Sequence, residues 1–148
     1  MKIILVIVSG VLLLLIQNTT AAGEISSTIL VNESVSWDGG TFKYVKGTPK
    51  ITIQKINIST GSKEVSLAVH CHTIPLAAYV LKGSVKVVKP SGENKLFKEG
   101  DAFIEVMNKW HKGVFVEDTE LIVFYAGEKG VPLSVKEDGS SPLSKACK

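Results

Sequence analysis

The feature that most constrains this chain is a series of short segments in which apolar and polar residues alternate, separated by turn residues. Alternation with a period of two is typical of half-buried β-strands, and no long helical period follows the N-terminal region. The expected turns lie at 82–83, 90–92 and 99–101, and each contains a glycine. The expected strands are 51–58, 66–72, 76–81, 84–89, 95–97, 102–107 and 121–126. Many short strands joined by such turns predict an all-β sandwich or barrel.

The first 22 residues differ in character from the rest of the chain. Lys2 is followed by an almost wholly apolar run at 3–16, a short polar stretch, and the small residues at 21–23. This order is typical of a secretory signal peptide at 1–22, cleaved after Ala22 or Gly23. The alternative is an uncleaved anchor, although the run is short for a membrane span. We therefore expect a periplasmic or extracellular protein without stable membrane insertion after cleavage.

Length and charge narrow the range of partners. The chain has 148 residues and a net charge of +3, and all 17 of its basic residues are lysine. Lysine lacks the planar fork with which arginine recognises phosphates and base edges, and these lysines are interleaved with acidic residues. We therefore expect no nucleic-acid partner. The length predicts one domain, and the polar, serine-rich stretch from Glu137 predicts a loosely held tail.

The three histidines of the chain lie in two places. His70 and His72 flank Cys71 at the end of an expected strand, so alternation points both imidazoles to one face and the cysteine to the other. His111 follows Trp110 after the next hairpin, and a neighbouring antiparallel strand could bring it beside the pair. Three neutral imidazoles can bind one divalent transition metal, Fe, Mn, Ni, Zn or Cu. The default interpretation of such a pair taken alone is a satisfied or exposed pair of histidines in a strand.

The spacing around the first two histidines resembles that of the cupins, a superfamily of small β-barrels whose first motif reads G-x5-H-x-H-x3,4-E-x6-G. His70 and His72 occupy the histidine positions, and Gly83 occupies the closing glycine position. Glu64 stands where the first glycine is expected, and Leu76 stands in the acidic position. The resemblance therefore includes the histidines and the final turn but not the carboxylate.

The second cupin motif reads G-x5-P-x-G-x2-H-x3-N. Gly100 and His111 match its first glycine and its histidine. Val106, Asn108 and Phe115 stand in the proline, second glycine and asparagine positions. The resemblance to cupins covers about residues 36–136. Within the superfamily, the chain resembles a group of exported, single-domain cupins more specifically, in the strings at 36–39, 105–111 and 123–127.

From this resemblance we expect a small, jelly-roll-like cupin barrel at 36–136, between an N-terminal segment at 23–35 and the polar tail at 137–148. It implies a metal bound by His70, His72 and His111, without the usual carboxylate because Leu76 offers no ligand atom. It also implies a homodimer, since cupins are often dimers.

Glu105 could act as a substitute ligand or as a general base, and the alternative is a surface or structural carboxylate. Alternation places it with Asp101 and Phe103, and does not decide whether that face lines the barrel interior. Three aromatic residues could line the mouth of the pocket or simply pack in the core or rim. They are Tyr79, Trp110 and Tyr125.

The two cysteines leave two alternatives open. Alternation places Cys71 on the apolar face opposite the histidines, with Leu67 and Val69, and that face must be covered by the N-terminal segment, the tail or a second subunit. A disulfide to Cys147 would attach the tail there, and export would allow the bond to persist. The alternative is a buried thiol at 71 and a free thiol at 147.

Two functions follow from these expectations. The first is a metal-dependent, small-molecule dioxygenase or related oxidoreductase. The second is a non-catalytic barrel that binds a metal or a small ligand, and a metal-free barrel is a third alternative. Whether the chain is an enzyme is left open by the fold, because cupins host many functions.

Overall fold

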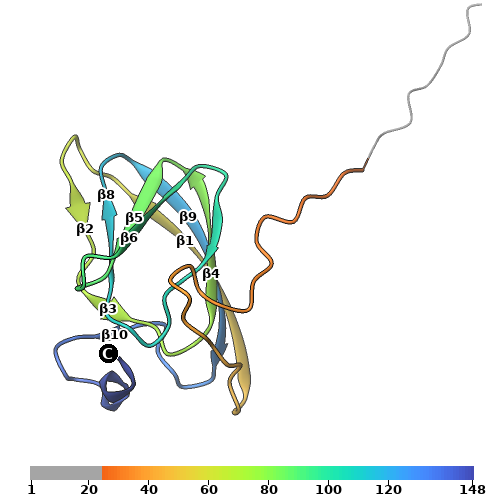
Figure 1. The fold of residues 1–148 in the computed structure, drawn as a ribbon, viewed down its shortest axis with the longest axis vertical. Coiled ribbons are helices and arrows are strands. Elements are labelled where there is room, and N and C mark those ends of the chain that lie inside the picture. The colour runs from red at the N-terminus through yellow and green to blue at the C-terminus, as the bar shows by residue number, and fades with distance from the viewer. Residues whose placement is uncertain (1–24) are drawn as a thin grey trace, which may run out of the picture.

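The computed structural model describes residues 25–148, and over this range the chain is all-β, with no α-helix. Two four-stranded antiparallel sheets face each other to form a barrel (Figure 1). The first sheet has the order β1 (Pro49–Ile58), β9 (Thr119–Glu128), β4 (Leu76–Lys82) and β7 (Ala102–Ile104). The second has the order β2 (Val65–Ser66), β8 (Lys112–Phe115), β5 (Ser84–Val88) and β6 (Asn94–Lys98). The predicted all-β, barrel-type fold is confirmed.

A third, two-stranded pair lies at the end of the barrel where the chain finishes (Figure 1). It joins β3 (His70–Cys71) to β10 (Val135–Lys136), and a 3₁₀-helix at Pro142–Ala146 follows. Two of the three histidine positions therefore belong to, or border, this small pair rather than a large sheet.

The core fills the space between the two large sheets. Side chains alternate strictly along β9, where Leu121, Val123 and Tyr125 are buried and Phe124 is exposed. Val85 and Val87 of β5 face them from the second sheet as part of the same apolar cluster. This burial of alternate residues is the physical basis of the period of two in the sequence.

The turn between β4 and β5 explains the glycine at its centre. Gly83 has φ of +73°, in the left-handed region that residues with a Cβ rarely adopt. A Cβ at this position would also collide with the carbonyl oxygen of Asp118 and the hydroxyl of Thr119. Glycine is therefore required here both by the backbone conformation and by close packing.

Three details differ from the sequence-based expectations. The strand expected at 66–72 is interrupted, so that only β2 and β3 remain of it. The strands β8 and β10 were not predicted, because each is short and β8 contains Gly113. The tail expected to be loosely held is instead attached to the barrel by a disulfide and by backbone hydrogen bonds at Lys148.

The predicted signal peptide at 1–22 lies outside the described residues. Within 25–148, no helix has the length and hydropathy needed to cross a membrane.

Candidate metal centre

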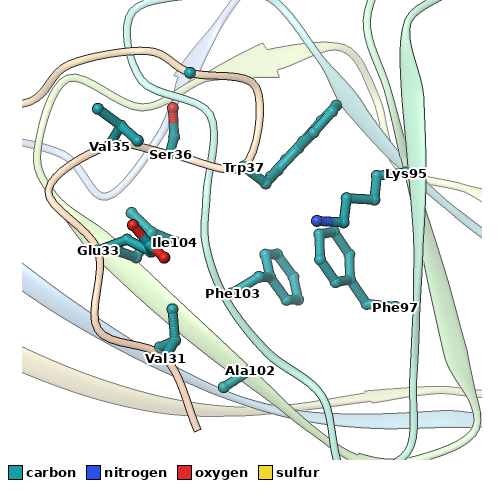
Figure 2. Close-up of a pocket in the computed structure, with 11 residues that line it drawn as sticks. Val31, Glu33, Val35, Ser36, Trp37, Lys95, Phe97, Ala102, Phe103 and Ile104 are labelled. Atoms are coloured by element: carbon teal, nitrogen blue, oxygen red, sulfur yellow. The ribbon is translucent and has the colours of Figure 1, made fainter.

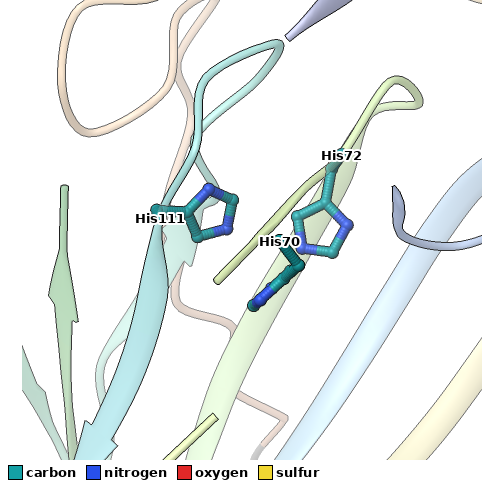
Figure 3. Close-up of side chains that lie close together, drawn as sticks. All are labelled: His70, His72 and His111. Atoms are coloured by element: carbon teal, nitrogen blue, oxygen red, sulfur yellow. The ribbon is translucent and has the colours of Figure 1, made fainter. Parts of the chain in front are cut away.

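The three histidines come together at the end of the barrel that carries β3. His70 and His111 pair across an antiparallel bridge, in which each main-chain N–H donates to the other residue's carbonyl at 2.9 Å. His72 follows β3, and its carbonyl accepts a hydrogen bond from the N–H of Asn108 at 2.9 Å. The ring centroids lie 4.6–5.2 Å apart, and the rings face a common point (Figure 3). The predicted approach of His111 to the pair is confirmed.

Each imidazole is oriented by a backbone carbonyl. The Nδ1 atoms of His70 and His111 lie 2.9 Å from the carbonyl oxygens of Ala68 and Lys109. The Nδ1 atom of His72 lies 2.7 Å from the carbonyl oxygen of Leu133. A carbonyl can only accept, so Nδ1 carries the proton in all three rings and Nε2 keeps its lone pair. Such outer hydrogen bonds fix the tautomer and the ring orientation of metal-binding histidines.

Burial keeps these imidazoles neutral. Removal from water lowers the pKa of His70 and of His111 below 6.5, although the carbonyl acceptors oppose this shift. Burial likewise lowers the pKa of His72 to about 3, and the neighbouring histidines lower it further. At neutral pH all three rings are therefore in the form that can bind a metal.

The donor set fits a single metal ion. One nitrogen from each ring lies within 4.8 Å of the corresponding nitrogens of the other two. The Nε2 atom of His111 is buried and has no hydrogen-bond partner within the described chain. An unpartnered buried nitrogen is costly, and a metal would satisfy it. His72 and His111 are almost fully buried, whereas His70 is partly exposed, so one side of the cluster opens toward the cavity.

The loop that carries His111 depends on a residue in the left-handed region. Asn108 has φ of +54°. It stands in the second glycine position of the cupin-like motif, and asparagine is among the few residues with a side chain that adopt this conformation readily. The departure from the motif therefore preserves the backbone conformation that the loop requires.

The cluster forms part of the wall of a cavity of about 310 Å³ inside the barrel. Most of its lining is aliphatic or aromatic, from both large sheets. The polar side chains along it are few and come from separate strands. Besides the histidines they are Gln54, Glu105, Tyr125, Ser134 and Lys136. An apolar cavity with few polar groups is typical of a site for a small organic molecule.

Glu105 lines this cavity together with Phe103, so the face left undecided by the sequence is the inner one. Its Oε1 atom accepts hydrogen bonds from the indole N–H of Trp37 at 3.2 Å and from the N–H of Val106 at 2.8 Å. Burial raises the pKa of Glu105 above 4.5, although these two donors and His70 oppose the shift. The carboxyl group is thus near the histidines, half-buried and easier to protonate than a surface glutamate.

The aromatic candidates have separate locations. Tyr125 lines the cavity, with its ring 6.1 Å from that of His72. Tyr79 borders a different hollow, on the outer face of the first sheet, and Trp110 lies near Lys148. Leu76, in the acidic position of the motif, is buried in the core and also lines the cavity.

The interrupted strand corrects one expectation about the opposite face. Leu67 and Val69 line the cavity with the histidines, rather than lying opposite them with Cys71, because regular alternation ends at β2. Cys71 does point away: it forms a disulfide with Cys147, with a Cα–Cα distance of 6.2 Å. Of the two alternatives for the cysteines, the disulfide is the one observed.

A second cavity, of about 420 Å³, lies between residues 31–39 and the strands β6 and β7 (Figure 2). It contains no histidine. Phe97 and Phe103 stack at its base with centroids 3.8 Å apart, and Trp37 meets Phe97 edge to face. Because these aromatic side chains pack against the core, we interpret this hollow as a gap between packed elements rather than as the reactive site.

Sequence reasoning missed several groups around the histidines. Gln54 and Ser134 line the cavity and Trp37 donates to Glu105, and no motif linked these residues to the site. The three orienting carbonyls carry no side-chain signal at all. The local backbone conformation reveals two of them, at Ala68 and Lys109, and the tertiary structure reveals the third, at Leu133.

No protein-family model matches the chain, and no curated protein is similar to it in sequence. Solved structures with a similar fold include a cupin-2 domain containing protein from Shewanella frigidimarina (12% identity; 66% of this chain and 86% of that one; TM-score 0.45). Others are the DMSP lyase DddQ from Ruegeria pomeroyi (12%; 62% and 45%; 0.48) and a salicylate 1,2-dioxygenase from Pseudaminobacter salicylatoxidans (16%; 51% and 21%; 0.45). The chain thus spans only 21% of the length of that dioxygenase. At these identities the likeness concerns the course of the backbone, not the chemistry of the site.

Proposed function

We propose that this chain binds one divalent transition metal through His70, His72 and His111 and uses it in oxygenase-type chemistry on a small, largely apolar molecule. The observation that carries the proposal is the convergence of three neutral imidazoles, each held by a carbonyl at Nδ1 so that Nε2 is left for a ligand bond. Three protein ligands leave coordination positions open, which is typical of catalytic rather than structural metal sites.

The residues around the cluster suit this chemistry. A metal bound there would act as a Lewis acid and orient its ligands. The aliphatic lining of the cavity would exclude water and hold the apolar part of a substrate. Glu105, with its raised pKa, is the group placed to hold or move a proton. Both of its hydrogen bonds from the described chain go to Oε1, so Oε2 is the atom for that role.

A specific observation favours a second candidate, a barrel that binds a metal or small ligand without turnover. The Oε1 atom of Glu105 is engaged by Trp37 and Val106, which is also the arrangement expected of a structural carboxylate. Leu76 removes the anionic ligand from the acidic position. The distinction between the two candidates lies in turnover, not in metal binding.

The metal content of the purified, untagged protein tests what both candidates share. We expect about one transition metal per chain, and its loss in His72→Ala because two ligands remain. Thr73→Val is the matched control: it alters the next residue and removes only a hydroxyl that is buried without a hydrogen-bond partner in the described chain. Absence of metal from the wild-type protein after incubation with Fe(II), Mn(II), Ni(II), Cu(II) and Zn(II) would refute both candidates.

Oxygen consumption then separates the candidates. The loaded protein is screened with small aromatic and aliphatic acids under air, next to Glu105→Gln. Substrate-dependent uptake of oxygen supports the oxygenase. Binding of such molecules without uptake supports the binding barrel.

We propose in addition that the protein is exported and forms a homodimer. The Cys71–Cys147 disulfide supports export, because such bonds persist in oxidising compartments. The exposed apolar side chains Ile51, Ile53 and Phe124 on the outer face of the first sheet support the dimer. Fractionation of the producing cells tests the location, and light scattering on the purified protein tests the dimer.

A further inference from the structure

The disulfide lies at an unusual place with respect to the histidines. Cys71 is the residue between His70 and His72, and it is fully buried. Its partner, Cys147, follows the 3₁₀-helix Pro142–Ala146. The bond therefore attaches the last segment of the chain directly behind the two neighbouring ligands.

The same segment also binds the loop that carries the third histidine. The N–H of Lys148 donates to the carbonyl of Asn108 at 3.0 Å, and the N–H of Trp110 donates to the main-chain oxygen of Lys148 at 3.0 Å. Asn108 in turn donates to the carbonyl of His72. Residues 147–148 thus contact both segments of the site, one covalently and the other by hydrogen bonds.

We infer that the Cys71–Cys147 bond and residues 147–148 position the histidine cluster, so that affinity for a divalent metal depends on this disulfide. The inference rests on the proposed metal site. Cys71 and Cys147 are positioning residues: they point away from the cluster and act through the backbone of 70–72 and 108–111. Without the bond, Lys148 has no covalent tie to keep it against Asn108 and Trp110. The two histidine segments would then be joined by the His70–His111 bridge and by the Asn108–His72 hydrogen bond, without the covalent support behind Cys71.

A dithiol can reduce the Cys71–Cys147 bond in the folded protein. It transfers two electrons and two protons to the Sγ–Sγ bond, which leaves two thiols on the protein and a disulfide on the reductant. Cys147 is partly exposed and provides the point of attack. The strands of the two large sheets need not separate, because neither cysteine belongs to them.

The experiment measures Zn(II) affinity by calorimetry and amide hydrogen exchange by mass spectrometry on the full chain without metal. The samples are the wild-type protein, the same protein held under a dithiol for the exchange measurement, and the thiol-free variant Cys71→Ala/Cys147→Ser. Gly83→Ala is the matched control, because it strains a turn between β4 and β5 that contacts neither the disulfide nor the cluster. This control distinguishes a loss of Zn(II) affinity caused by misplaced histidines from one caused by a general loss of stability.

We expect the thiol-free variant to bind Zn(II) about 10- to 100-fold more weakly, the range typical of lost support around metal ligands. In the dithiol-treated protein and in the variant, exchange should rise at 70–72 and 108–111 while β4 and β9 stay protected. Gly83→Ala should keep the wild-type affinity. Unchanged affinity in the thiol-free variant, or an equal loss in Gly83→Ala, would overturn the inference. If the wild-type protein binds no Zn(II) or other divalent metal, the proposed function fails, and the exchange data alone decide whether the disulfide holds the histidine segments.

Discussion

A buried carboxylate near the site supports the sharpest prediction about stability. The side chain of Asp38 is fully buried, and its Oδ2 atom accepts from the ammonium groups of Lys89 at 2.8 Å and Lys109 at 2.7 Å. Its Oδ1 atom accepts from the hydroxyl of Ser36 and the N–H of Gly40. Although burial alone would raise the pKa of Asp38, the lysines and these hydrogen bonds lower it well below its usual range. The carboxylate thus connects the 36–40 turn to Lys89, directly after β5, and to Lys109 in the loop before His111.

The loss of stability in Asp38→Ala depends on the contacts that Lys89 and Lys109 keep when the carboxylate is removed. Removing one member of a buried ion pair costs about 3–5 kcal/mol, because the other charge is left buried. Lys89 keeps Glu93 at 2.6 Å, and the side chain of Lys109 is 37% exposed and can reach water. We therefore expect the lower end, a loss of about 3 kcal/mol in the free energy of unfolding. Asp38→Asn should lose about 2 kcal/mol, since it keeps an acceptor for Ser36 and Gly40.

Urea unfolding at pH 7, followed by the fluorescence of the two tryptophans, measures this loss. Glu93→Ala is the matched control: its carboxylate is 48% exposed, and such surface pairs contribute at most about 1 kcal/mol. Because folding lowers the pKa of Asp38, its contribution is present above the unfolded value of 3.8 and declines as the pH falls below it. If Asp38→Ala loses no more stability than Glu93→Ala, the burial argument is wrong.

The remaining predictions concern the site and its supports. The pKa of His72 is lowered from 6.5 to about 3, so the unfolded chain binds the extra proton between these values. The metal-free protein should therefore lose about 1.4 kcal/mol per pH unit below 6.5 through this residue, and a urea midpoint that stays constant from pH 8 to 5 would contradict it. Glu105→Gln should retain metal but lose any turnover, as measured by metal analysis and oxygen uptake together; full activity would exclude Glu105 as the proton carrier. Gly83→Ala should lower the unfolding free energy by about 1–3 kcal/mol through backbone strain, and an unchanged urea midpoint would contradict the positive φ. Cys147→Ser should lower it by about 2–4 kcal/mol, since the disulfide closes a long loop, and calorimetry with and without a dithiol checks this.

The sequence predicted the features that depend on local pattern. The period of two located most of β1, β4, β5 and β9, because one face of each strand must be buried. The turn at Gly83 was visible because glycine there is required by the backbone. The pairing of His70 with His72 on one face followed from strand geometry, even though the strand itself is only two residues long.

The features that were missed depend on contacts between distant residues. The interruption between β2 and β3 leaves no mark in composition, since Leu67, Ala68 and Val69 would suit a continuous strand. The attachment of the tail was open because the Cα separation of two cysteines cannot be read from their spacing. The ion pairs of Asp38 with Lys89 and Lys109 could not be predicted either, because they join residues that are far apart in sequence.

The hydrogen bonds that orient the three imidazoles also differ in whether their acceptor is local or distant in sequence. His70 and His111 each use the carbonyl two residues earlier, so a correct local backbone is enough to orient them. His72, the ring with the most strongly lowered pKa, instead uses Leu133, from the segment that leads into β10 and the disulfide-linked tail. The histidine cluster is therefore complete only when the last sixteen residues, 133–148, are in place on the barrel. Changes in that segment should reach the site through His72 and Cys71, whereas changes on the far side of the barrel should alter stability without altering the arrangement of the ligands.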